Sequence, residues 1–325
     1  MMSVATNGLV SLLGVDPATY RPHELHRGQR SYPETNCYTD ILIELLHARG
    51  DEPLAAMGFT VRTDFEGDQW TFFKPPPGDL ETLFGVDIHE MQPYRALPGQ
   101  IAEQIGRGRT LIVELDAWHL PDTAGTSYAR EHVKTSVAAE AIDLVGERLR
   151  YFHNGGLYEL SDGDYRGALR LPCAPAAEAL PPYTEIVRFD AGPRLDGEEL
   201  RAAAVLLLRH HLARRPQENP FVRFAEQLSS DLPRLLEGTA ADYHAYAFAN
   251  VRMAGSAFEI TATHVDWLLG AAASSCADAL REIVAGCKVL SFRLARRRAF
   301  DPASTVEGLA GAWERAMGEL DELVG

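Results

Sequence analysis

The hydrophobic pattern of this 325-residue chain changes its period near residue 195, and this change limits the folds that the chain can adopt. Before that point, short runs rich in β-branched and aromatic residues stand between stretches with helical spacing, which is typical of a domain that mixes strands and helices. After it, apolar residues recur at every third or fourth position, which predicts helices alone. The helical spacing covers residues 198–213, 221–236, 240–253, 265–298 and 304–324. We therefore predict an α+β domain over residues 1–194, followed by an α-helical domain over residues 195–325.

The strands of the first domain are predicted to form an antiparallel sheet. Residues 110–115 are the clearest buried strand, and the strands at 133–144 and 148–153 are joined by a hairpin. Gly155 and Gly156 then form a tight turn before another strand. Connections this short join antiparallel neighbours. Further strands are expected at 59–63, 69–73, 157–160 and 183–190, helices at 38–48, 51–57, 79–84 and 98–106, and a connector rich in Pro and Ala at 171–182.

Composition and charge exclude several classes of protein. Hydrophobic residues make up 46% of the chain, which is enough for a substantial core. The formal net charge of −15 at pH 7 argues against nucleic acid or an anionic membrane as the main partner. The N-terminus lacks the basic start and apolar run of a signal peptide, and no apolar stretch reaches transmembrane length. We therefore expect a cytoplasmic protein.

The cysteines of this chain do not form a metal-binding pattern. They are Cys37, Cys173, Cys276 and Cys287. Their spacing contains no C-x-x-C pair and fits no zinc site, and a reducing cytoplasm would keep the thiols free. Cys276 and Cys287 lie in apolar helical sequence, so we expect them to be buried.

The histidines also provide no complete set of metal ligands. His23 and His26 are three residues apart but have no third ligand nearby. His210 and His211 are adjacent, so they point to different faces of a predicted helix. We predict no metal site and no bound cofactor.

Cys37 is the residue that most directly suggests chemistry, because it stands just before a stretch with helical spacing. The positive end of a helix favours a thiolate over a thiol. Thr35 or Asn36 is expected to cap this helix, which leaves the backbone N–H of Cys37 free to point at a developing oxyanion. The ordinary alternative is a buried thiol without a catalytic role.

A thiolate nucleophile needs a base and a group that holds the base in its useful tautomer. His132 opens the predicted strand at 133–144, and Asn154 follows the next strand by a hairpin, beside the start of the His132 strand. His153 and Asn154 alternate in direction, so only one of them faces the cleft, and Asp143 lies farther along the strand. The third catalytic residue is therefore open among Asn154, His153 and Asp143. Cysteine, then histidine, then an orienting amide or acid is the chain order of a papain-like thiol catalyst.

Three residues after the clearest strand are candidates for substrate binding. Asp116 ends this strand, where an unpaired carboxylate would hold the α-ammonium of an aminoacyl donor. The alternative is a carboxylate that caps a turn. Trp118 and His119 follow, either as walls of the cleft or as ordinary packing residues.

The segment Val-Glu-Leu-Asp-Ala-Trp-His-Leu-Pro at residues 113–121, followed by His132 and a strand, resembles the butirosin-biosynthesis protein H family. The resemblance covers roughly residues 20–165 and implies a papain-like N-terminal domain. The chain also resembles a group of bacterial proteins associated with amino acid:carrier-protein ligases. These resemblances imply transfer of an aminoacyl group from a carrier-protein thioester to an amine.

The resemblance also implies roles for individual residues. Cys37 would take the acyl group, His132 would move the proton, and Asn154 would orient His132. The family usually has Asp in the third position, whereas papain itself has Asn. Papain also has a Gln shortly before its Cys for the oxyanion hole; here the nearest is Gln29, eight positions upstream, so Gln29 and Asn36 are the oxyanion candidates.

The implied partners are an acyl or aminoacyl carrier protein, which would bring its own phosphopantetheine, and a small-molecule or peptide amine. Carrier proteins are typically acidic, so docking one would require a basic patch on this acidic chain. Residues 209–215 and 293–300 are the two candidate stretches, although such stretches are commonly solvated helix ends. Two other functions stay open: a thiol amidase or peptidase, and a binding protein that retains the cleft without catalysis.

Overall fold

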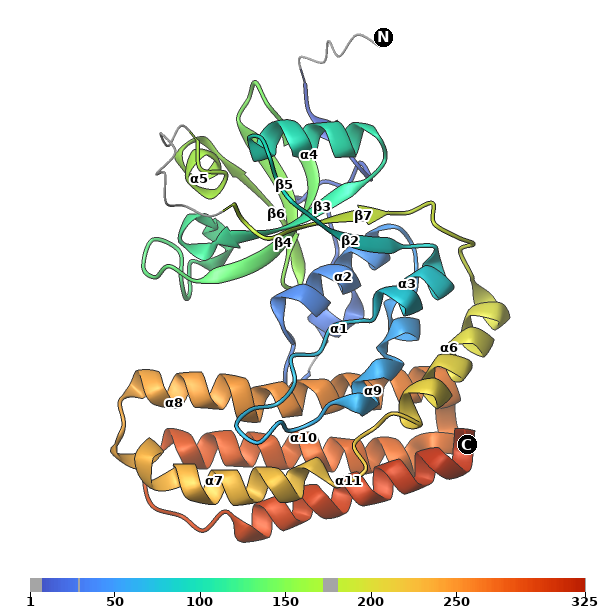
Figure 1. Cartoon of the computed structure of the whole chain (residues 1–325), viewed down its shortest axis with the longest axis vertical. Coiled ribbons are helices and arrows are strands. Elements are labelled where there is room, and N and C mark those ends of the chain that lie inside the picture. Colours follow the sequence, from blue (N-terminus) through green and yellow to red (C-terminus); the bar gives the residue numbers. More distant parts are fainter. Residues whose placement is uncertain (1–7, 29, 172–180, 325) are drawn as a thin grey trace. The chain divides into compact units, whose positions relative to one another are not determined.

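The protein is described by a computed structural model that covers residues 8–28, 30–171 and 181–324 (Figure 1). The chain packs as two compact units. The described residues of 8–28, 36–52 and 80–194 form the first unit, and residues 30–35, 53–79 and 195–324 form the second. The predicted fold class is confirmed: the first unit combines an antiparallel sheet with helices, and the C-terminal region is helical.

The sheet of the first unit has the strand order β2-β7-β3-β4-β5-β6, with β1 beside β4. All the pairings between described strands are antiparallel, as the short predicted connections require. The strands are β1 (Val10–Ser11), β2 (Asp87–Met91), β3 (Thr110–Asp116), β4 (Lys134–Asp143), β5 (Arg148–His153), β6 (Gly156–Ser161) and β7 (Thr184–Arg188). The sequence pattern predicted five of these strands within a few residues of their bounds, but it missed β1 and β2.

The two faces of the sheet are covered by different helices, as Figure 1 shows for α4 and α2. On one face, α4 (Leu97–Gly106) and α5 (Asp162–Ala168) bury Leu111, Val113 and Leu115 of β3. On the other face, α2 (Cys37–Ala48) packs against β4 and β5. Because side chains alternate along a strand, Ile112, Glu114 and Asp116 of β3 belong to the α2 face.

The helix α2 is unusual in being buried on nearly all sides, from Tyr38 to Leu46. Asn36 caps its first turn, since its side-chain Oδ1 accepts a hydrogen bond from the Thr39 N–H at 2.9 Å. After its C-terminus, Gly50 adopts a φ of +78°, a conformation that favours glycine. The predicted cap and helix are thereby confirmed. The short α1 (Glu24–Arg27) precedes α2, and α3 (Pro77–Phe84) comes before β2.

The second unit is built mainly of helices. They are α6 (Gly197–Leu212), α7 (Pro220–Glu237), α8 (Ala240–Tyr246), α9 (Met253–Leu269), α10 (Ser274–Ala295) and α11 (Ala303–Val324). A π-helical turn at Ala247–Arg252 joins α8 to α9. The helix predicted at 265–298 is broken, because Gly270 has a φ of +60° and ends α9.

Two of the predicted strands were wrong. Residues 59–63 lie in a 3-10 helix over Pro53–Arg62, and residues 69–73 contribute only one isolated bridge, between Phe65 and Trp70. These segments belong to the second unit, where Trp70 packs against Phe221 and Phe224 of α7. Their apolar side chains are therefore buried against helices instead of a neighbouring strand. The predicted connector at 171–182 lies mostly outside the described residues.

Candidate active site

Cys37 is the first residue of α2, and it is a free, partly exposed thiol. The first four backbone N–H groups of a helix have no hydrogen-bond partner within the helix. In α2, the N–H of Thr39 is one of these groups, and it donates to the side-chain oxygen of Asn36. The side-chain oxygen of Asn36 therefore serves as a cap. The helix dipole stabilises a negative charge on a sulfur in this position.

The first turn of α2 contacts the sheet through the residue next to Cys37. The Tyr38 hydroxyl donates a hydrogen bond of 2.6 Å to Oε2 of Glu185, and the Tyr183 hydroxyl donates one of 2.7 Å to Oε1. Glu185 pairs with Ile112 of β3, so these groups share one face of the sheet. Asp116 is four residues beyond Ile112 and belongs to the same face.

His132 is held by Asp116 on this face. Its Nδ1 lies 2.6 Å from Oδ2 of Asp116, and its ring stacks on the Trp118 indole with centroids 4.6 Å apart and planes 12° apart. Oδ1 of Asp116 also accepts the Trp118 N–H at 3.0 Å. Burial works against ionisation of Asp116, but the hydrogen bonds from His132 and Trp118 outweigh it and lower the pKa of the carboxyl group.

This pairing determines which ring nitrogen of His132 is available. An ionised carboxylate can only accept a hydrogen bond, so Nδ1 carries a proton, and in the neutral imidazole the lone pair is then on Nε2. None of the described residues forms a hydrogen bond with Nε2, and 71% of the His132 side chain is exposed. The ring is thus oriented by one nitrogen and open to a reactant at the other.

The hydrogen bonds differ from the predicted roles at two positions. Asp116 is paired with His132, whereas the sequence suggested an unpaired carboxylate for the substrate. Within the described part of the chain, no hydrogen bond joins Asn154 to His132; Asn154 lies in the turn between β5 and β6 with a φ of +45°. The observed partner of the His132 ring is therefore Asp116.

His153 and Asp143, the other candidates for the residue that orients His132, form hydrogen bonds with other groups. The buried ring of His153 lies between Thr135 Oγ1, at 2.8 Å, and Asp122 Oδ2, at 2.5 Å. Asp143 accepts the Gly146 N–H at 2.8 Å at the far end of β4. Neither group contacts His132.

Two further predicted residues can be placed only in part. The ring of His119 lies against Gly167 of α5, so it does not join the stacked pair of Trp118 and His132. Gln29 lies outside the described residues. Among the described residues, Cys37 Sγ forms no hydrogen bond with the His132 ring.

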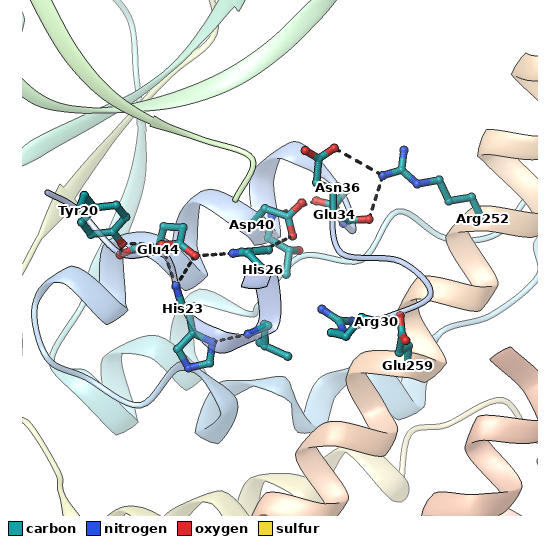
Figure 2. Close-up of polar contacts among 12 residues, drawn as sticks. Tyr20, His23, His26, Arg30, Glu34, Asn36, Asp40, Glu44, Arg252 and Glu259 are labelled. Carbon is teal, nitrogen blue, oxygen red and sulfur yellow. Dashed lines mark hydrogen bonds and ion pairs between the residues drawn. The ribbon is translucent and has the colours of Figure 1, made fainter. Parts of the chain in front are cut away.

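A buried charged cluster next to α2 was missed by the sequence analysis (Figure 2). Nε2 of His26 lies 3.2 Å from Oδ1 of Asp40, and its Nδ1 contacts Oε1 of Glu44. Glu44 also accepts the Tyr20 hydroxyl at 2.5 Å and the His23 N–H at 3.0 Å. The sequence signals were His23 and His26, which the sequence analysis considered only as metal ligands, and a pair of acids four residues apart on a helix whose neighbours are apolar.

The charges in this cluster are set by its hydrogen bonds. Burial opposes the charged form of His26, but hydrogen bonds to Asp40 and Glu44 outweigh it and raise its pKa to about 9. Both ring nitrogens therefore donate to carboxylates, so His26 is an imidazolium and cannot act as a base. For Glu44, burial is likewise outweighed by the bond from His26, which lowers the pKa. Burial lowers the pKa of the neighbouring His23 to about 4.

We also examined the described residues for a metal site, a membrane-spanning helix and other reactive thiols. They contain no group of three or more His, Cys, Asp or Glu side chains placed to hold a metal ion. None of their helices is both long and apolar enough to span a membrane. The predicted burial of Cys276 and Cys287 is confirmed, with exposed fractions of 0% and 1%, and burial raises the pKa of each thiol to about 12.

Comparison with known proteins gives a family for most of the chain. Residues 21–189 match the family model described as the DUF1839 N-terminal domain. Residues 197–322 match the DUF1839 C-terminal domain. No curated protein matches the chain.

Proposed function

The chain belongs to the DUF1839 family, whose two domains together span most of it. The family description gives no activity, so we infer one from the residues of the site. We propose that it is a cysteine-dependent acyltransferase, which moves an aminoacyl group from a carrier-protein thioester to an amine through an acyl-Cys37 intermediate. The observation that carries the proposal is the pairing of His132 with Asp116 on the sheet face that the first turn of α2 contacts.

Each half of the site has a defined chemical role in this proposal. Cys37 is at a helix N-terminus, where the dipole favours the thiolate and its backbone N–H can donate to an oxyanion. His132 has its Nδ1 proton on Asp116, so Nε2 can take and return a proton. Nucleophile and base are commonly farther apart without substrate than during reaction. With 71% of its side chain exposed, His132 is accessible to a reactant at Nε2.

The reaction proceeds in two balanced steps. First, Nε2 of His132 takes the Cys37 proton, the sulfur attacks the thioester carbonyl, and the carrier thiolate leaves with the proton returned by the imidazolium. The new bond joins Cys37 Sγ to the acyl carbon, and the old carbon–sulfur bond breaks. Next, an amine attacks this carbon while His132 takes its proton, and Cys37 leaves as a thiolate. The product is an amide.

Intact-mass spectrometry tests the covalent step directly. We expect that mixing the protein with an aminoacyl thioester of N-acetylcysteamine adds one acyl group, and that a primary amine then removes it as an amide. Release of the free acid at an equal rate with and without amines would instead identify a hydrolase. If no acyl group is added, and iodoacetamide labels Cys37 no faster than the other thiols, the binding-protein alternative is favoured.

Substitution of Asp116 tests the orienting role. In Asp116→Asn, the amide can donate to Nδ1 and stabilise the wrong tautomer of His132, so we expect the rate of acylation to fall by roughly 10²-fold to 10⁴-fold. The rate should recover in part as the pH rises, because the thiolate then forms without help from His132.

Two matched controls distinguish this role from those of the other candidates. Asn154→Gly keeps the left-handed backbone at a φ of +45°, and Asp143→Asn makes the same chemical change at the far end of β4. Both should acylate at close to the wild-type rate. A large loss in Asn154→Gly with little change in Asp116→Asn would reverse the assignment.

A further inference from the structure

An open groove of about 970 Å³ runs along the outer face of α10 in the second unit. Its lining residues on α10 are Arg281, Val284, Ala285, Lys288, Val289, Phe292 and Arg293, and Arg296 directly follows the helix. Their spacing of three and four residues places them on one stripe of the helix. From residue 281 to residue 296 this stripe is about 22 Å long, which is the length of about four helical turns. Residues of α9 and the segment at Arg30 and Ser31 complete the groove.

The groove has an apolar centre that is partly open to solvent. Phe292 is 59% exposed and Val289 is 45% exposed, although both lie on a helix that also packs on α9 and α11. Large apolar side chains that are exposed together and rimmed by polar groups are characteristic of interaction surfaces. The centre of the groove therefore suits an apolar stripe on a partner.

The cations beside this centre are not neutralised. Lys288, Arg293 and Arg296 form no ion pair with any carboxylate among the described residues; Arg293 donates only to the backbone oxygen of Asp301, at 3.3 Å, and Arg296 lies over the Phe292 ring. By contrast, Arg281 at the other end of the groove pairs with two aspartates. The groove therefore presents three cations without an ion pair to the described residues, on a chain whose net charge is −15.

The acidic residue inside the groove already has partners. Glu259 of α9 accepts the backbone N–H groups of Ser31 and Tyr32 at 2.7 and 2.8 Å, and it lies 3.5 Å from Arg30 (Figure 2). It therefore holds the wall of the groove in place and does not neutralise the three cations.

We propose that this groove binds an acidic amphipathic helix of a partner protein. The apolar residues of such a helix would cover Val289 and Phe292, and its flanking carboxylates would pair with Lys288, Arg293 and Arg296. A concave groove four turns long fits a helix better than it fits a lipid surface, and the acidic chain repels the backbone of a nucleic acid. The proposal does not depend on the chemistry at Cys37, which is in the other unit.

A synthetic peptide provides the test. The probe is a fluorescent helix of about 16 residues, with Leu at helical spacing on one face and Glu beside it. We expect it to bind the full-length protein, and to bind at least about tenfold more weakly to the charge-reversed variant Lys288→Glu/Arg293→Glu/Arg296→Glu. Higher salt should also weaken binding. Arg234→Glu on α7, an exposed site away from the groove, and Cys37→Ala should bind as the wild type does.

Several outcomes would overturn the proposal. They are equal binding of a peptide with the same composition in scrambled order, equal binding to the triple variant, or binding of phosphatidylserine vesicles in preference to the peptide. Concentration-dependent dimerisation in sedimentation velocity that is lost in the triple variant would also contradict it, because the groove would then be occupied by a second copy of the chain. Lys288 and Arg296 are exposed and Arg293 is partly exposed, so circular dichroism of the triple variant should match that of the wild type.

Discussion

Replacing Cys37 by alanine is expected to abolish formation of the acyl-enzyme and to lower the rate of amide formation by about 10⁴-fold or more. The variant lacks the partly exposed thiol at the first residue of α2, and no other group in the site can form the thioester intermediate. Intact mass after incubation with the aminoacyl thioester measures the first effect, and product formation with an amine measures the second. Cys37→Ser should show the same loss, because a serine hydroxyl is a far weaker nucleophile here.

The other thiols provide the internal comparison for this prediction. Cys276 and Cys287 are buried, and burial raises the pKa of each to about 12, so neither should react with iodoacetamide near neutral pH. Peptide mapping of the labelled protein should find Cys37 modified first. An acyl group that still attaches to Cys37→Ala, at a rate near that of the wild type, would contradict the proposed nucleophile.

Replacing His26 by glutamine is expected to destabilise the first unit by about 3–5 kcal/mol. The change leaves Asp40 and Glu44, whose side chains are 0% exposed, without the cation that lies between them. Urea unfolding measures the loss of free energy, and hydrogen exchange of the α2 amides locates it. His89→Gln is the matched control, because His89 also pairs with an aspartate but 62% of its side chain is exposed. Its effect should stay within about 0.5 kcal/mol.

The stabilising effect of His26 should also depend on pH. Its pKa is raised from 6.5 to about 9 in the folded chain, so the folded state binds the proton more tightly than the unfolded state. The contribution is fully present below pH 6.5 and is lost as the pH rises through 9, and its size is about 3 kcal/mol. Urea unfolding across this range should show the loss in the wild type and not in His26→Gln. An unchanged pH profile in the variant would contradict the buried imidazolium.

Much of the fold was predictable from local sequence patterns. The period of two in β4 and the period of three to four in α10 are set by backbone geometry, so they can be recognised without knowing what each element packs against. The same reasoning failed at residues 59–63 and 69–73. There, aromatic and β-branched residues are buried against helices of the second unit, and no strand lies beside them to complete a ladder. Apolar composition alone does not distinguish these two kinds of burial.

The candidate site was predictable to a smaller extent. Asn36 as the cap of α2 followed from its residue type and position, and Cys37 at the helix start followed with it. The partner of the His132 ring could not be predicted from residue type and position. Asp116 and His132 are 16 residues apart and meet only because β3 pairs with β4, and the register of that pairing decides which carboxylate is in reach.

The amino-acid sequence by itself determined most helices and strands and the position of one thiol at a helix N-terminus. These properties depend on spacing and capping within a few residues. Tertiary structure alone decided that Asp116 orients His132 and that His26 is a buried cation between Asp40 and Glu44. Hydrogen bonds and charges act over only a few ångströms, so their partners are known only when distant segments of the chain are brought together.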